Sequence, residues 1–167
     1  MSRAIAAALA AATLLAGCGG DGEPKTVTKE RYVAEGDNVC ARLGDRFARA
    51  GATDPQTPQQ IAESADVLAD LYGKLLDGLQ DITLPTDPAD RRGAEAYVAA
   101  VRRTDPLLAG LRSSAQRFVT AAGAADTREL TQAGIAVRAA LDALRAAQAQ
   151  ADGRALDYGF NYCGTLH

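Results

Sequence analysis

The sequence predicts an all-α protein, an up-down-up-down four-helix bundle with one disulfide. Two observations carry this prediction. Apolar residues recur at helical spacing in four separate segments, whereas no stretch shows the sustained alternation of apolar and polar residues that a half-buried strand needs. The joints between the segments are short and contain proline, glycine or helix-capping residues, which favours antiparallel neighbours in a bundle.

The first predicted helix covers residues 29–50. Gly36 lies within its apolar stripe, where the missing side chain would let a neighbouring helix approach closely, at about 1 kcal/mol of helix propensity relative to alanine. The stripe consists of Tyr32, Val33, Val39, Cys40, Leu43 and Phe47.

The second predicted helix has the clearest start signal. Thr57 is placed to cap it, Pro58 suits the first helical position, and Gln60 completes a capping box. We expect the helix to stop at Leu84, because the residue before a proline, here Pro85, resists the helical conformation. Its stripe consists of Ile61, Ala65, Leu68, Leu71, Tyr72, Leu75, Leu79 and Ile82.

The third predicted helix starts after a cap at Thr86 or Asp87, with Pro88 near its first position. Pro106 lies inside its apolar pattern, whose phase is nearly kept on both sides. One kinked helix is therefore favoured, and the alternative is a second helix restarted with Asp105 as its cap. The stripe consists of Tyr97, Val98, Val101, Leu108, Leu111, Ala115, Phe118 and Val119.

The fourth predicted helix begins at Asp126, with Glu129 at the capping-box position. Residues 152–153 are a point where it could fray or kink, and the apolar trend resumes before Gly159. Its stripe consists of Leu130, Ala133, Val137, Leu141, Leu144 and Ala151.

Residues 1–17 have the organisation of a secretory signal peptide. Arg3 is followed by an uncharged apolar run over residues 4–16, too short to span ~30 Å of hydrocarbon as a helix. The next residues complete Leu15-Ala16-Gly17-Cys18, which resembles the lipobox of bacterial lipoproteins. The resemblance implies cleavage before Cys18 and diacylglycerol on its sulfur. The alternative is an ordinary signal peptide that happens to contain a cysteine.

The chain would then divide into a lipidated cysteine with a flexible tether, residues 18–28, and a helical bundle domain, residues 29–167. Two or three acyl chains hold a protein stably on a bilayer. Lipid on Cys18 would therefore anchor the domain to the outer, extracytoplasmic face of the cell membrane, on a tether with a reach of about 17 Å.

Composition excludes several classes of function. Loss of Arg3 with the signal peptide leaves seventeen basic and twenty-one acidic side chains, a net charge of −4, which gives no footprint for nucleic acid. The sole histidine is His167 and the sole methionine is Met1. A histidine-based triad, a zinc site or a ferritin-like di-iron site would need more histidine, so we predict no cofactor, no metal and no enzymatic activity.

Two cysteines remain once Cys18 is set aside, Cys40 and Cys163. An even pair in an exported protein predicts a disulfide, and the long spacing argues against a redox-catalytic pair. The bond would stabilise the fold by roughly 4–5 kcal/mol in the chain-entropy model. Because Cys40 lies about 16 Å into its helix, either the C-terminal tail folds back along the bundle or the first helix overhangs it.

Aromatic residues gather around this predicted bond. Tyr158, Phe160 and Tyr162 could pack there with Tyr32. We favour an aromatic plug that seals the end of the bundle, and the alternative is a ligand-binding site in which these rings stack on a bound molecule.

A strip of carboxylates recurs at helical spacing along the second predicted helix: Asp66, Asp70, Asp77 and Asp81. They lie nearly opposite the leucine stripe. We interpret them as a solvated outer face rather than as a cation-binding strip.

Two sequences carry a family resemblance: Tyr32-Val-Ala-Glu-Gly-Asp-Asn-Val-Cys40 and Tyr158-Gly-Phe-Asn-Tyr-Cys163-Gly164. With the lipobox, they resemble small uncharacterised lipoproteins of high-GC Gram-positive bacteria, in which a cysteine pair links the first helix to the C-terminal tail. The resemblance implies export, a disulfide and a helical fold. The resemblance implies no particular activity.

The sequence therefore favours a non-enzymatic interaction or structural module that holds an envelope protein partner near the membrane. The alternative is a carrier of a small or apolar ligand in a cavity of the bundle. A large apolar pocket with a few inward polar groups would favour the carrier, whereas a solid core with an exposed apolar patch would favour the module.

Overall fold

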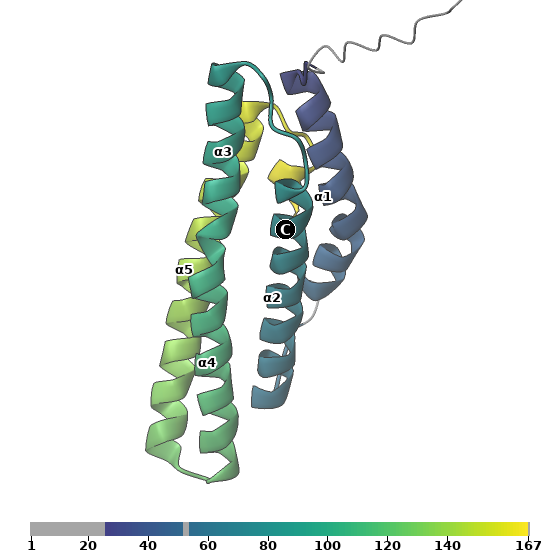
Figure 1. Ribbon diagram of the computed structural model, residues 1–167. Helices are drawn as coiled ribbons and strands as arrows, with labels where there is room; N and C mark the ends of the chain where they lie inside the picture. The colour runs from purple at the N-terminus through teal and green to yellow at the C-terminus, as the bar shows by residue number, and fades with distance from the viewer. Residues whose placement is uncertain (1–25, 52–53, 167) are drawn as a thin grey trace, which may run out of the picture.

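The computed structural model describes residues 26–51 and 54–166, and these residues fold as an all-α bundle (Figure 1). Five α-helices and one 3₁₀ helix occur in these ranges. Residues 1–17, Cys18 and the tether as far as Lys25 lie outside the described residues. The elements are α1 (Lys29–Gly51), α2 (Pro58–Gln80), α3 (Pro88–Arg102), α4 (Thr104–Gly123), α5 (Thr127–Tyr158) and η1 (Cys163–Thr165).

The helices form four rods, because α3 and α4 follow one another along a single line (Figure 1). The rods run alternately down and up, which confirms the predicted up-down-up-down bundle. α2 packs on both α1 and α4, and α5 packs along α3 and α4. α1 packs on α2 and on η1, without an extensive contact to α5.

The rod of α3 and α4 is interrupted at Arg103 alone. Arg103 keeps a right-handed helical conformation, with φ −64° and ψ −16°, so the direction of the rod is preserved. The break follows from Pro106, which has no N–H for the carbonyl four residues earlier. The Thr104 hydroxyl donates to the Val101 carbonyl at 2.7 Å. The favoured single kinked helix is therefore wrong, because the segment forms two collinear helices, α3 and α4. The second helix does restart, but Asp105 does not cap it, since no side chain caps α4.

The predicted cap residues at the helix starts are confirmed. Thr57 accepts the Gln60 N–H at 3.2 Å while the Gln60 side chain accepts the Thr57 N–H at 3.1 Å, which is a complete capping box. Asp87 caps α3, and Asp126 caps α5 by accepting the N–H groups of Arg128 and Glu129. The expected capping box at α5 is incomplete, because the Glu129 side chain makes no reciprocal hydrogen bond within the described residues. α5 runs through residues 152–153 without a break.

The predicted end of α2 at Leu84 is wrong, because the helix ends at Gln80. The segment between α2 and α3, residues 81–87, makes tertiary contacts that a helix there would not allow. Ile82 and Pro85 are buried, and the backbone N–H of Thr86 donates to the Val27 carbonyl at 2.9 Å. These tertiary contacts require the chain to leave the helix early. They also bury Val27, so the folded domain begins before α1.

The core is built mainly from leucine on α2 and small or branched residues on its neighbours. Leu71, Leu75 and Leu79 are buried in one cluster with Val101 and Leu111 of the α3–α4 rod. Within the described ranges, no helix combines the length and the apolar character that crossing a membrane requires.

Candidate functional site

The C-terminal segment, residues 159–166, folds back from the end of α5 and lies beside α1 (Figure 1). A disulfide joins Cys40 of α1 to Cys163 of this segment, with their Cα atoms 5.1 Å apart. Both cysteines are buried. The predicted disulfide is therefore confirmed, and of the two arrangements expected for it, the folded-back tail is the one adopted.

The turn that starts this segment depends on Gly159. Its φ of +107° is a left-handed conformation that glycine adopts without strain. The Gly159 N–H donates to the Leu156 carbonyl and the Phe160 N–H to the Ala155 carbonyl, at 3.0 and 2.9 Å. This is a Schellman end, and it reverses the chain toward α1.

Asp37 binds the backbone of the segment. Its carboxylate accepts the N–H of Asn161 at 3.0 Å, of Tyr162 at 2.8 Å and of Cys163 at 3.3 Å. Three successive N–H groups around one anion form a nest. Asp37 is only 9% exposed, so these hydrogen bonds replace the water that a buried carboxylate loses. Sequence reasoning missed Asp37, although its position three residues before Cys40 places it on the same helix face.

Phe160 is the residue of the segment that enters the bundle. Its ring fits against Gly36, where a Cβ atom would collide with the ring. The close approach predicted at Gly36 is therefore made by a side chain of the C-terminal segment and not by a neighbouring helix. Three tyrosine rings surround it: the ring centroids of Tyr97, Tyr158 and Tyr32 lie 4.8, 5.5 and 6.0 Å from that of Phe160.

Three of the four predicted aromatic residues meet in this cluster: Tyr32, Tyr158 and Phe160. Tyr162 does not, because it is 59% exposed and follows the segment's turn outward. Tyr97 of α3 belongs to the cluster instead. It was in the predicted stripe of the third helix, and α3 starts at the end of the bundle where α5 finishes, so topology could have placed it.

The hydroxyl groups of the cluster differ in their hydrogen bonding. The Tyr158 hydroxyl donates to the Asp90 carbonyl at 2.9 Å, and the Lys29 ammonium lies 4.8 Å from the centre of the Tyr158 ring. The Tyr32 hydroxyl is fully buried and has no hydrogen-bond partner among the described residues. Burial raises the pKa of both Tyr32 and Tyr158 to about 12, and it also raises the pKa of Tyr97.

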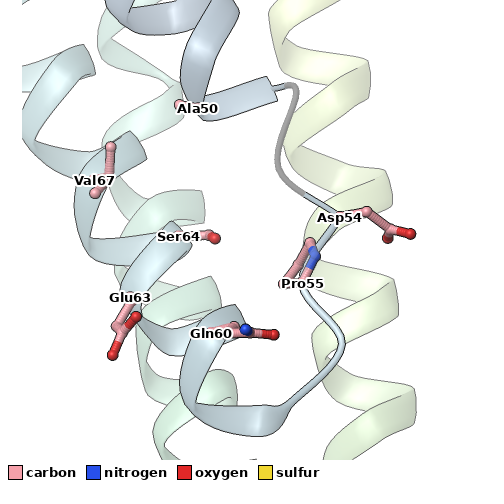
Figure 2. Close-up of a pocket in the computed structure, with 7 residues that line it drawn as sticks. All are labelled: Ala50, Asp54, Pro55, Gln60, Glu63, Ser64 and Val67. Carbon is pink, nitrogen blue, oxygen red and sulfur yellow. The ribbon is translucent and has the colours of Figure 1, made fainter.

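A hollow of about 430 Å³ lies where the chain passes from α1 to α2 (Figure 2). Asp54 and Glu63 line it but extend in opposite directions, and Gln60 already serves the capping box. Val67 is its one large apolar side chain. The hollow therefore lacks the convergent polar groups of a typical ligand site.

A larger hollow, about 870 Å³, lies between α2 and α5. We call it the α2–α5 groove and define it by Ile61, Phe118, Ile135, Val137, Arg138 and Leu141. Phe118 reaches it from α4, between the two flanking helices. Ile135 is 65% exposed, the highest value among the exposed large apolar side chains of the described residues.

Two of the four carboxylates in the predicted acidic strip form ion pairs. Asp70 pairs with Lys74 at 2.6 Å and with Arg46 of α1 at 3.3 Å, and these partners lower its pKa. Asp66 pairs with Arg112 of α4 at 2.6 Å. Within the described residues, no group of three or more potential ligand side chains could hold a metal ion.

Comparison with known proteins gave no match: no family model, no curated protein and no solved structure matched this chain. The resemblance to lipoproteins of high-GC Gram-positive bacteria therefore stays a prediction from the quoted residues. The helical fold and the disulfide between the first helix and the C-terminal tail are the parts of it that the structure displays.

Proposed function

We propose that the protein is a lipoprotein anchored through Cys18 to the outer face of the cell membrane, where it acts as a non-enzymatic interaction or structural module of the envelope. The Cys40–Cys163 disulfide carries the proposal. Such bonds form and persist in oxidising compartments and are rare in the cytosol. Residues 1–17 would supply the export signal and Cys18 of the lipobox the attachment point that such a location requires.

The surface of the bundle supports the interaction role. The aromatic rings at the disulfide-bonded end pack on one another and are largely buried. The α2–α5 groove, in contrast, opens on the surface and exposes Ile135. Its exposed Ile135 lies beside the half-buried Phe118 and Leu141, an apolar arrangement that a bound macromolecule could cover.

The anchor is tested by metabolic labelling with a palmitate analogue. The wild-type protein should incorporate the label and fractionate with membranes, whereas Cys18→Ala should incorporate none. Cys163→Ser is the matched control, because it removes a cysteine without removing the attachment point, so it should be labelled like the wild type. An unlabelled wild-type protein, or equal labelling of Cys18→Ala, would exclude the anchor.

One observation favours the second candidate, a carrier of a small or apolar ligand. The Tyr32 hydroxyl is buried in the aromatic cluster without a hydrogen-bond partner among the described residues. A ligand with one polar group could satisfy it. Native mass spectrometry of protein from the producing cell distinguishes the two: a reproducible non-covalent mass supports the carrier, and a chain without one supports the module.

A further inference from the structure

α1 ends before the level at which α2 begins, so α1 does not cover the full length of α2 (Figure 1). The rings of Phe47 and Tyr72 lie 5.1 Å apart, which fixes the level at which the end of α1 meets α2. α1 continues for only four residues beyond Phe47, about 6 Å, whereas Ile61 lies about 16 Å further along α2 from Tyr72. The described part of α1 therefore ends before it reaches the level of Ile61.

The α2–α5 groove lies beside the first turn of α2, at Ile61, which the described part of α1 does not reach. In the bundle α2 and α5 both pack on α4, and Phe118 of α4 forms the floor between them. A fourth rod set over that floor would touch both flanking helices. The groove follows α5 from Thr131 to Arg145, about 21 Å, which is the length of roughly fourteen helical residues.

The lining of the groove is apolar at its floor and cationic at its rim. Phe118 and Leu141 are half-buried and Val137 is buried. Arg145 pairs with Asp142 at 3.3 Å. Arg138, which is exposed beside them, has neither an ion pair nor a side-chain hydrogen bond within the described part of the chain. A carboxylate on the occupant would complement it.

We propose that the α2–α5 groove binds an amphipathic helix of a partner protein, whose apolar face lies on Phe118 and Leu141 and whose acidic flank meets Arg138. Helix-in-groove recognition of this kind uses apolar anchors at spacings of three, four and seven residues. The inference rests on the proposed interaction role and specifies its site and the class of partner.

A second copy of this chain fits the groove less well. The exposed large apolar side chains of the described residues are Val67, Ile135, Leu156 and Tyr162. They are scattered over α2, α5 and the C-terminal segment. They do not form one stripe at helical spacing that could fill a groove.

The test uses two synthetic helical peptides of about fourteen residues, both with leucine at the anchor spacing, one flanked by glutamate and the other by lysine. Each is titrated into the purified full protein with labelled methyl groups. The glutamate peptide should shift the methyl signals of Ile61, Ile135, Val137 and Leu141. The lysine peptide should bind more weakly by up to about fivefold, because that is the most that one exposed ion pair contributes.

Charge reversal tests whether Arg138 is the residue that makes the groove prefer the glutamate peptide. Arg138→Glu should reverse the order of the two peptides. Arg154→Glu is the matched control, because it makes the same change at an exposed position of α5 outside the groove. Ile135→Glu should remove binding, and since Ile135 is 65% exposed, its replacement should leave the fold intact.

The inference would be overturned by no shift of the groove methyl groups, by equal affinity for the two peptides, or by the same effect from Arg138→Glu and Arg154→Glu. Shifts of these methyl groups that depend on protein concentration alone would overturn it in favour of a second copy. The titration does not involve the lipid, so its failure is distinct from a failure of the palmitate labelling.

Discussion

The carboxylate of Asp37 accepts the backbone N–H of Tyr162 at 2.8 Å, which joins two residues 125 positions apart in the sequence. Three residues further along α1, Cys40 holds Cys163 covalently. We call this pair of attachments, made by Asp37 and Cys40, the C-terminal latch. It keeps the Phe160 ring among three tyrosines, at the end of the bundle where the folded chain begins.

Replacement of Asp37 tests the non-covalent half of the latch. Asp37→Ala leaves three N–H groups without their charged acceptor, so the free energy of unfolding should fall by about 2–3 kcal/mol. Urea denaturation measures it. Asp77→Ala on the exposed face of α2 is the control and should stay within about 0.5 kcal/mol of the wild type. Equal stability of the two variants would contradict the role given to Asp37.

Replacement of either Cys40 or Cys163 tests the covalent half. Each serine variant should lose about 2–5 kcal/mol, because the unfolded chain is no longer restricted by a loop that closes most of the domain. The wild type treated with a thiol reductant should fall to the same stability. Single variants that melt like the oxidised wild type would show that the bond does not stabilise the fold.

Two glycines of α1 should respond in opposite ways to alanine. Gly36→Ala places a Cβ atom against the Phe160 ring, so we expect a loss of about 1–3 kcal/mol from overpacking. Gly44→Ala meets no atom within 4 Å and should gain about 0.5–1 kcal/mol through helix propensity. Thermal unfolding of both variants checks this, and a stable Gly36→Ala would mean that Phe160 does not lie there.

The hydroxyls of Tyr32 and Tyr158 predict different outcomes for the same substitution. Tyr158→Phe removes the hydrogen bond to the Asp90 carbonyl and should lose about 1 kcal/mol. Tyr32→Phe removes a buried hydroxyl without a partner in the described residues, so stability should stay the same or rise. A loss of 1 kcal/mol or more in Tyr32→Phe would instead reveal a bound partner for that hydroxyl, as the carrier hypothesis requires.

Stability should decline in alkaline solution. The fold favours the neutral phenol of Tyr32, whose pKa is raised by burial to about 12 from an ordinary value of 10.0. The contribution is complete below about pH 10 and is lost as the pH rises to about 12, at roughly 1.4 kcal/mol per pH unit for a buried tyrosine. Urea denaturation across this window measures the slope. Tyr32→Phe should decline less steeply, and an identical slope would contradict the assignment.

The sequence predicted local structure best. The caps at Thr57, Asp87 and Asp126 depend on side chains that bond within their own first turn, so spacing alone identifies them. The four apolar stripes predicted the four rods, because helical periodicity is also a local property of the sequence. The end of α2 was missed because it depends on a contact between Thr86 and Val27, which the local pattern does not encode.

The candidate site was predicted only in part. The cysteine pair and three aromatic residues were found, since composition and spacing mark them. Tyr162 was misplaced because the left-handed Gly159 and the turn at η1 direct it outward, which a count along the tail cannot foresee. Asp37 was missed because a carboxylate inside an apolar stripe acquires its meaning only from the N–H groups that the tail brings to it.

The intact mass of the protein released gently from its own membrane tests the central claim most directly. The account predicts a chain that begins at Cys18, carries the mass of acyl groups there, and is two hydrogen atoms lighter than its reduced form because of the Cys40–Cys163 bond. A chain that keeps residues 1–17, or one without acyl mass, would contradict the anchor. Free thiols at Cys40 and Cys163 would contradict the covalent half of the C-terminal latch.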